Sequence, residues 1–79
     1  MTLYQFNSLP KDNQYDAVLN GSGVYLDNHI QGNQRFNLYA IDRFFVEIQY
    51  DSQKNEIVGL RSFKTGKLLD RYSNLKTDF

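Results

Sequence analysis

The sequence predicts an α+β domain: a four-stranded antiparallel meander with an N-terminal and a C-terminal helix, in the order α-β-β-β-β-α. Apolar residues recur at helical spacing in two short segments near the chain ends, and they alternate with polar residues over residues 24–63. Turn-forming residues divide this central segment into four pieces of strand length. A chain of 79 residues has room for one domain, taken as residues 1–79.

The first helix is predicted from about Pro10 to Leu19. Proline is tolerated in the first turn because its missing N–H would have no partner there, and Ser8 is a suitable cap. The apolar residues of this segment share one face, and the Asn-Gly-Ser-Gly sequence at residues 20–23 ends the helix. Residues 3–6 fit either a strand or coil.

Strands are expected at about residues 24–30, 36–41, 44–50 and 57–63. The first turn, Gly32-Asn33, is a hairpin signal because both residues tolerate positive φ. The second turn, Asp42-Arg43, lacks the usual Asn-Gly chemistry, so a bulge could lie there.

The second helix is expected from about Thr65 to Leu75. Its apolar residues have the i, i+4, i+7 spacing of a buried stripe. They are Leu68, Leu69, Tyr72 and Leu75.

The first two turns set the pairing of the first three strands. A tip at the first turn places His29 opposite Phe36 and Tyr25 opposite Ala40. A tip at the second turn places Ala40 opposite Phe45.

The last loop sets the pairing of the fourth strand. If Tyr50 pairs with Glu56, then Glu47 faces Gly59, and Arg61 lies diagonally across from Glu47. Phe45 would then face Arg61.

One side of this sheet is predicted to be the core, with both helices packed on it. Its members are Val24, Leu26, Tyr39, Ile41, Phe44, Val46, Ile48, Val58 and Leu60.

The opposite side, here called the mixed face, combines large apolar and polar residues. Apolar surface rimmed by polar groups is typical of an interface or a ligand site. The alternative is that a terminal segment folds over it, with Leu3, Tyr4 and Phe6 or with Phe79. The mixed face is predicted to contain Tyr25, Asp27, His29, Phe36, Leu38, Ala40, Phe45, Glu47, Gln49, Ile57, Gly59, Arg61 and Phe63.

No residues have the spacing of a catalytic or metal site. His29 is the only histidine and there is no cysteine, so a zinc site is not expected. A general base also needs a nucleophile or substrate within reach, and His29 is better interpreted as a surface residue packed on Phe36. Glu47 and Arg61 either grip a polar ligand or form a cross-strand salt bridge that keeps the face soluble. We therefore expect no enzyme activity, cofactor or metal.

Charge and hydropathy argue against other classes of partner. Nine basic residues balance nine acidic ones, whereas nucleic-acid binding normally requires a basic excess. No apolar stretch approaches the ~20 residues that span a bilayer. The N-terminal residues lack the features of a signal peptide, so a cytoplasmic location is expected.

The stretch from Leu38 to Glu47 (LYAIDRFFVE) is followed by Asn55-Glu56-Ile57, and Ser62-Phe63 precedes a leucine-rich segment. This pattern, over about residues 24–75, resembles a group of short uncharacterised bacterial proteins. The resemblance implies a stand-alone bacterial domain and brings with it no activity, cofactor or functional residue.

These observations favour a small non-enzymatic module that binds another protein or forms a homodimer through the mixed face. The alternative is a small-molecule-binding domain with a site near Glu47, Gly59 and Arg61. The interface or ligand candidates are Tyr25, His29, Phe36, Phe45, Glu47, Arg61 and Phe63.

Overall fold

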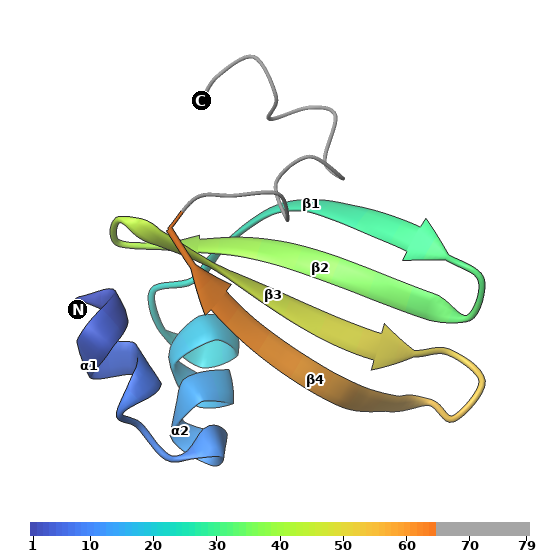
Figure 1. The fold of residues 1–79 in the computed structure, drawn as a ribbon, viewed down its shortest axis with the longest axis horizontal. Coiled ribbons are helices and arrows are strands. Elements are labelled where there is room, and N and C mark those ends of the chain that lie inside the picture. The colour runs from blue at the N-terminus through green and yellow to red at the C-terminus, as the bar shows by residue number, and fades with distance from the viewer. Residues whose placement is uncertain (65–79) are drawn as a thin grey trace.

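Four antiparallel strands form one sheet in the order β1-β2-β3-β4, so each strand pairs with its neighbours in sequence (Figure 1). The computed structural model describes residues 1–64, and the helix predicted from Thr65 to Leu75 lies outside them. Within the described part, the predicted meander is confirmed. The strands are β1 (Val24–Gln31), β2 (Gln34–Ile41), β3 (Phe44–Asp51) and β4 (Glu56–Phe63).

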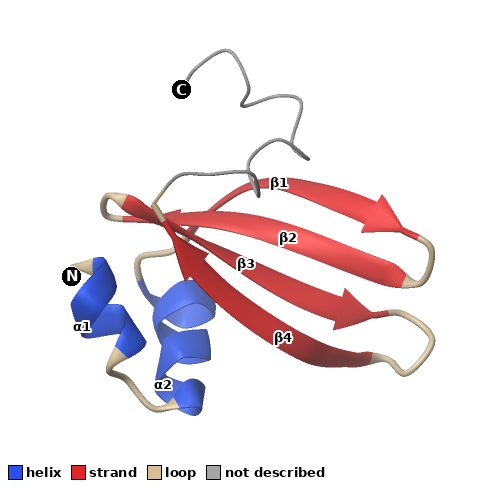
Figure 2. Cartoon of the chain, viewed as in Figure 1, coloured by secondary structure: helices blue, strands red, loops and turns tan. Residues whose placement is uncertain are grey.

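Two short helices precede the sheet, α1 (Leu3–Asn7) and α2 (Lys11–Asp16). The second continues as a π-helix, η1 (Ala17–Gly21), so the helical region predicted from Pro10 to Leu19 is present with a widened last turn. Figure 2 shows both helices at one end of the sheet, near the turn that joins β2 to β3. The strands extend beyond the helices toward the β1–β2 and β3–β4 connections.

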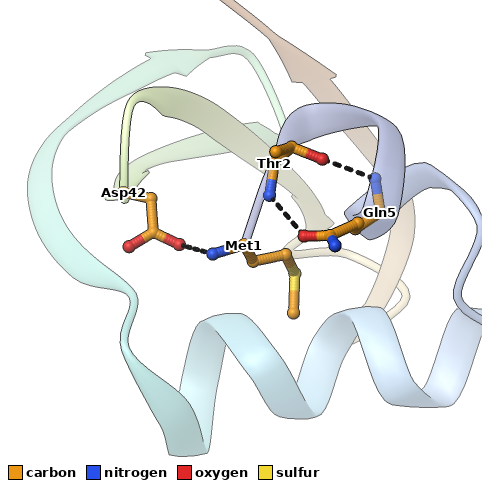
Figure 3. A network of polar contacts seen from close by, with 4 residues as sticks. All are labelled: Met1, Thr2, Gln5 and Asp42. Carbon is orange, nitrogen blue, oxygen red and sulfur yellow. Dashed lines mark hydrogen bonds and ion pairs between the residues drawn. The ribbon is translucent and has the colours of Figure 1, made fainter.

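Residues 3–6 are helical, neither strand nor coil, and α1 begins with a capping box (Figure 3). The Thr2 side chain accepts a hydrogen bond from the Gln5 N–H at 3.1 Å, and the Gln5 side chain accepts one from the Thr2 N–H at 2.9 Å. A helix of five residues is too short to produce a detectable apolar period, so the sequence pattern did not reveal it.

Ser8 does not cap the second helix, as the sequence suggested. It follows the last residue of α1, and its hydroxyl donates to the Tyr4 carbonyl at 3.0 Å. Pro10 occupies the N-cap position of α2 with no side-chain hydrogen bond. The buried Gln14 ties the two helices together, because its Nε2 donates to the Phe6 carbonyl at 3.0 Å.

The main core lies between the helices and one side of the sheet. The rings of Phe6 and Phe44 are 5.4 Å apart and tilted by 54°, which joins α1 to the start of β3. Four buried members of this core come from the predicted core side of the sheet. The buried residues are Phe6, Val18, Ile41, Phe44, Val46 and Ile48.

The β1–β2 pairing follows the prediction from Gln31 back to Asp27 and then departs from it. His29 pairs with Phe36, as expected. A β-bulge at Leu26 adds one residue to β1, so Tyr25 pairs with Tyr39 instead of Ala40. The bulge therefore moves Tyr25 to the helix side of the sheet, and it moves Leu26 out of the predicted core.

The β2–β3 pairing agrees with the prediction along its whole length, including Leu38 with Glu47 and Ala40 with Phe45. The turn at Asp42-Arg43 contains no bulge. Asp42 adopts φ 53°, a left-handed conformation that aspartate tolerates better than most residues.

The β3–β4 pairing differs from the prediction by two residues: Glu56 pairs with Asp51 instead of Tyr50, and a bulge at Val58 adds a further residue to β4. Arg61 consequently lies directly opposite Glu47, and Phe45 faces Phe63. Two residues assigned to the core from sequence are exposed: Val24 is 60% exposed at the start of β1, and Val58 is 43% exposed at the bulge.

Candidate functional site

The apolar side chains of the mixed face form a second cluster around Leu38, which is 0% exposed. Phe45 and Phe63 have ring centroids 5.9 Å apart, tilted by 31°. Phe36 and Leu26 complete the cluster, and all four residues around Leu38 are partly buried. Three predicted site residues, Phe36, Phe45 and Phe63, are therefore brought together as expected, but they enclose a buried leucine instead of forming a flat exposed surface.

The polar candidates on the mixed face are arranged differently from the prediction. Glu47 is 2% exposed and sits opposite Arg61, which is exposed. Gly59 lies opposite Gln49, and a Cβ at Gly59 would meet the Gln49 side chain at an ordinary 3.5 Å. Gly59 therefore does not create the space next to Glu47 that a ligand site at these residues would need.

Tyr25 lies on the helix side of β1 and is half-exposed. Its ring contacts Tyr39 edge-on, with centroids 5.7 Å apart, and its hydroxyl accepts a hydrogen bond from Asn28 Nδ2 at 2.7 Å. Burial, followed by the proximity of Tyr25, raises the pKa of Tyr39 above its ordinary value. Tyr25 therefore does not join the other candidates on the mixed face.

His29 remains on the mixed face and packs on Phe36, with ring centroids 6.1 Å apart. It belongs to β1, an edge strand of the described sheet. Asp27 lies two residues earlier in β1 and pairs with Leu38, so Asp27 and His29 flank Asn28 on the same side of the sheet.

The outer edge of β1 presents backbone groups that β2 does not use. The two-residue turn after Gln31 makes Gln31, His29 and Asp27 the hydrogen-bonded partners of β2. Asn28 and Ile30 therefore direct their N–H and C=O groups away from the sheet. Ile30 is 59% exposed and Asn28 is also exposed, so no element of residues 1–64 covers this edge at these two positions.

Asp27 interacts with this edge directly. Its Oδ1 accepts a hydrogen bond from the N–H of Asn28 at 2.7 Å. This contact occupies an outward-directed donor in the middle of the strand. Sequence reasoning did not single out Asp27, Asn28 or Ile30, although a signal was available: the first strand of a meander is an edge strand, and exposed edges need protection.

The outer edge of β4 differs, because α1 lies beside its C-terminal end. The Ser62 hydroxyl donates a hydrogen bond to Asn7 Oδ1. The bulge at Val58 disturbs the other end of the strand. Among the described residues, the edge of β1 is therefore the less covered of the two sheet edges.

A polar network joins the two loops at the far end of the sheet. The Asn33 carbonyl accepts hydrogen bonds from the Ser52 N–H at 2.8 Å and the Ser52 hydroxyl at 3.1 Å. Asn33 Nδ2 donates to Gln53 Oε1 at 2.9 Å. These bonds tie the β1–β2 turn to the β3–β4 loop.

Asp51 holds the β3–β4 loop in place. Its Oδ1 accepts the N–H groups of Lys54 at 3.0 Å and Gln53 at 2.9 Å, and its Oδ2 accepts Gln34 Nε2 at 3.0 Å. Hydrogen bonds, the one from the Lys54 N–H first and that from Gln34 next, hold the pKa of Asp51 below its ordinary value.

A cleft of about 490 Å³ lies beside the β2–β3 turn. Three of its polar residues are engaged with partners: the terminal amine of Met1 contacts Asp42 Oδ2 at 2.5 Å, and Thr2 is part of the capping box (Figure 3). Neither arrangement provides an activated nucleophile or general base. The lining residues are Met1, Thr2, Leu3, Asp42, Arg43, Phe44 and Lys64.

Two further observations concern residues 1–64. Nowhere in this range do three histidine, aspartate or glutamate side chains gather closely enough to hold a metal ion. In the same range, none of the helices has the length and apolar character needed to cross a membrane. Comparison of the chain with protein-family models, curated proteins and solved structures finds no match.

Proposed function

We propose that this protein is a non-enzymatic module that self-associates, with the outer edge of β1 as its contact surface. The observation that supports this best is the accessible edge itself, where Asn28 and Ile30 direct backbone groups outward. An edge strand of this kind is a template for pairing with another chain. The sequence of β1 favours a second copy of this chain as the partner.

The β1 edge is self-complementary about Asn28. Two antiparallel copies of β1 with a twofold axis through Asn28 place Asp27 of each copy opposite His29 of the other. A carboxylate and an imidazole form a hydrogen bond in this arrangement, and the symmetry makes it twice. Asn28 would meet Asn28 of the second copy and exchange both backbone hydrogen bonds with it.

The same pairing covers apolar surface that is exposed in the single chain. Ile30 is 59% exposed and Tyr25 is 50% exposed, and both lie on the helix side of β1. In this register Ile30 of one copy lies opposite Leu26 of the other, at the bulge, and next to Tyr25, which shares the helix side with Ile30. Aromatic–aliphatic neighbours across two strands stabilise a sheet by roughly 0.2–1 kcal/mol per pair.

The helices do not obstruct this pairing. They lie at the end of the sheet where β1 begins (Figure 1). Because the second β1 runs in the opposite direction, the helices of the two copies would lie at opposite ends of a continuous sheet.

The mixed face has less support as the contact surface, because Leu38 and Glu47 are already buried there. The alternative of a small-molecule site near Glu47, Gly59 and Arg61 also has less support, because Gly59 lies opposite Gln49.

Sedimentation velocity over about 1 µM to 1 mM tests the proposal. The wild-type chain should show a concentration-dependent monomer–dimer equilibrium. Ile30→Asp should weaken the dimer at least about tenfold, because two apolar contacts per dimer are lost and a charge is introduced. Ile57→Asp is the matched control: Ile57 is 43% exposed on the other edge strand, and its substitution should leave the equilibrium unchanged. A wild-type chain that stays monomeric throughout, or equal effects of the two substitutions, would overturn the proposal.

A further inference from the structure

We infer that Asp27 regulates the β1 edge by exchanging one hydrogen-bond donor for another. In the single chain its carboxylate accepts the Asn28 N–H and keeps the edge closed. In the paired state it accepts the imidazole N–H of His29 from the second copy, which frees the Asn28 N–H for the strand ladder. This inference rests on the proposed function and adds to it the residue that controls the contact.

The closed state follows from the contact between the Asp27 carboxylate and the Asn28 N–H. The Asn28 N–H is directed away from β2, and the Asp27 Oδ1 that binds it is 2.7 Å from the nitrogen. An incoming strand needs this N–H for its central hydrogen bond. The carboxylate must therefore leave before a second strand can pair at Asn28.

The bulge at Leu26 contributes to the same closure. It adds a residue to β1 immediately before Asp27 and ends the regular part of the strand there. The regular edge therefore runs from Asp27 to Gln31, with Asn28 and Ile30 as its outward positions. Because the regular edge is so short, occupation of the Asn28 N–H removes a large part of its pairing capacity.

The paired state follows from the spacing around Asn28. Asp27 and His29 are one residue on either side of it and lie on the same side of the sheet. In a pair centred on Asn28, the Asp27 carboxylate faces His29 of the second copy, at the distance of directly opposed cross-strand residues. The carboxylate thus has an acceptor role in both states, and no buried charge is left without a donor when it moves.

On the mixed face, the cross-strand row that begins with Asp27 continues through Leu38 to Glu47 and Arg61. Glu47 is buried and Arg61 lies at the opposite edge, so Asp27 is the carboxylate of this row that reaches the outer edge of β1.

Variants at Asp27 and His29 separate the two roles of the carboxylate. His29→Ala removes the proposed donor of the paired state and keeps the Asp27 contact with the Asn28 N–H, so the dimer should weaken about tenfold. Asp27→Ala introduced into His29→Ala removes only the closure and should strengthen the dimer about tenfold relative to His29→Ala alone. Asp27→Asn in the same background retains an oxygen that can accept the Asn28 N–H, and it should stay close to His29→Ala.

Asp16→Ala in the His29→Ala background is the matched control. It removes an exposed carboxylate whose Oδ1 accepts a hydrogen bond from Asn20, far from the β1 edge. Sedimentation velocity gives the dissociation constants, and hydrogen exchange at the Ile30 amide reports strand pairing directly. Exchange at the Ile30 amide should slow about twofold when the chain concentration equals the dissociation constant, and about tenfold at roughly fifty times that concentration.

The outcomes distinguish the inference from the proposed function. A wild-type dimer that is unaffected by His29→Ala, or an Asp27→Ala substitution that fails to strengthen the His29→Ala dimer, overturns the exchange by Asp27 and leaves self-association through β1 standing. A wild-type chain that never dimerises overturns both.

Discussion

At Gly23 the backbone lies very close to the preceding helical turn. A Cβ added at this position would lie 2.2 Å from the carbonyl oxygen of Val18, in the π-helical turn. That separation is far shorter than any non-bonded contact, and the obstructing atom belongs to the backbone, which cannot rotate away. The glycine therefore permits the tight passage from η1 into β1.

Gly23→Ala should lower the free energy of unfolding by about 1–3 kcal/mol, because the added methyl group forces η1 and β1 apart. Gly21→Ala, two residues earlier, is the matched control. Its Cβ would meet the Asp16 carbonyl at 3.6 Å, an ordinary contact, so stability should stay the same or rise by up to about 1 kcal/mol. Urea unfolding of both variants measures the difference, and equal stabilities would show that the close approach at Gly23 is relaxed in solution.

Asp51 makes the stability of the fold depend on acid pH. Its pKa is lowered in the folded state, chiefly by the hydrogen bond from the Lys54 N–H, so its carboxylate contributes stability at pH values above its ordinary pKa. This contribution is lost as the pH falls through the lowered, folded-state pKa. Asp51→Asn should therefore reduce stability at pH 7, and the two proteins should converge in acid.

Urea unfolding between about pH 7 and pH 2 measures this convergence. Gln34→Met provides a graded comparison, because it removes one donor to Asp51 and keeps the Lys54 N–H. Its acid dependence should lie between those of the wild-type chain and Asp51→Asn. Parallel curves for wild type and Asp51→Asn would contradict the role given to this carboxylate.

At the level of the strands, the turn residues correctly predicted the strand pairings next to each two-residue turn. Gly32 adopts φ 60° at the first central position of its turn, as the hairpin signal required, and the pairing of His29 with Phe36 follows from it. The β2–β3 pairing was likewise determined by the position of a two-residue turn.

The bulges explain what the sequence could not predict. A bulge inserts one residue without changing the composition or the apolar character of a strand. The apolar pattern of β1 therefore fits a strand with a bulge at Leu26 and equally a strand without one. Its consequence is large, because a shift of one residue moves every following side chain to the other face. This is why Tyr25 was assigned to the wrong side. Arg61 stays on the mixed face but lies directly opposite Glu47, because the bulge at Val58 and the pairing of Glu56 with Asp51 together shift β4 by two residues.

At the level of the whole molecule, the sheet has buried apolar residues on both sides. The helices cover the core around Phe44 and Val46, while Leu38 is enclosed on the other side among partly buried aromatic rings. A domain of this size buries only about 60% of the surface of its unfolded chain, so its margin of stability is small. Each fully buried side chain therefore accounts for a large share of the free energy of unfolding.

Leu38→Ala tests whether the cluster on the mixed face is a packed core. If Leu38 is as tightly enclosed as its 0% exposure indicates, its truncation leaves a cavity and should cost about 2–5 kcal/mol. Leu19→Ala removes the same atoms from a side chain that is 47% exposed in η1, and it should change stability by no more than about 0.5 kcal/mol. Urea denaturation provides both values. A small cost for Leu38→Ala, close to that of Leu19→Ala, would mean that the mixed face is open in solution, and it would return that face to consideration as the contact surface in place of the β1 edge.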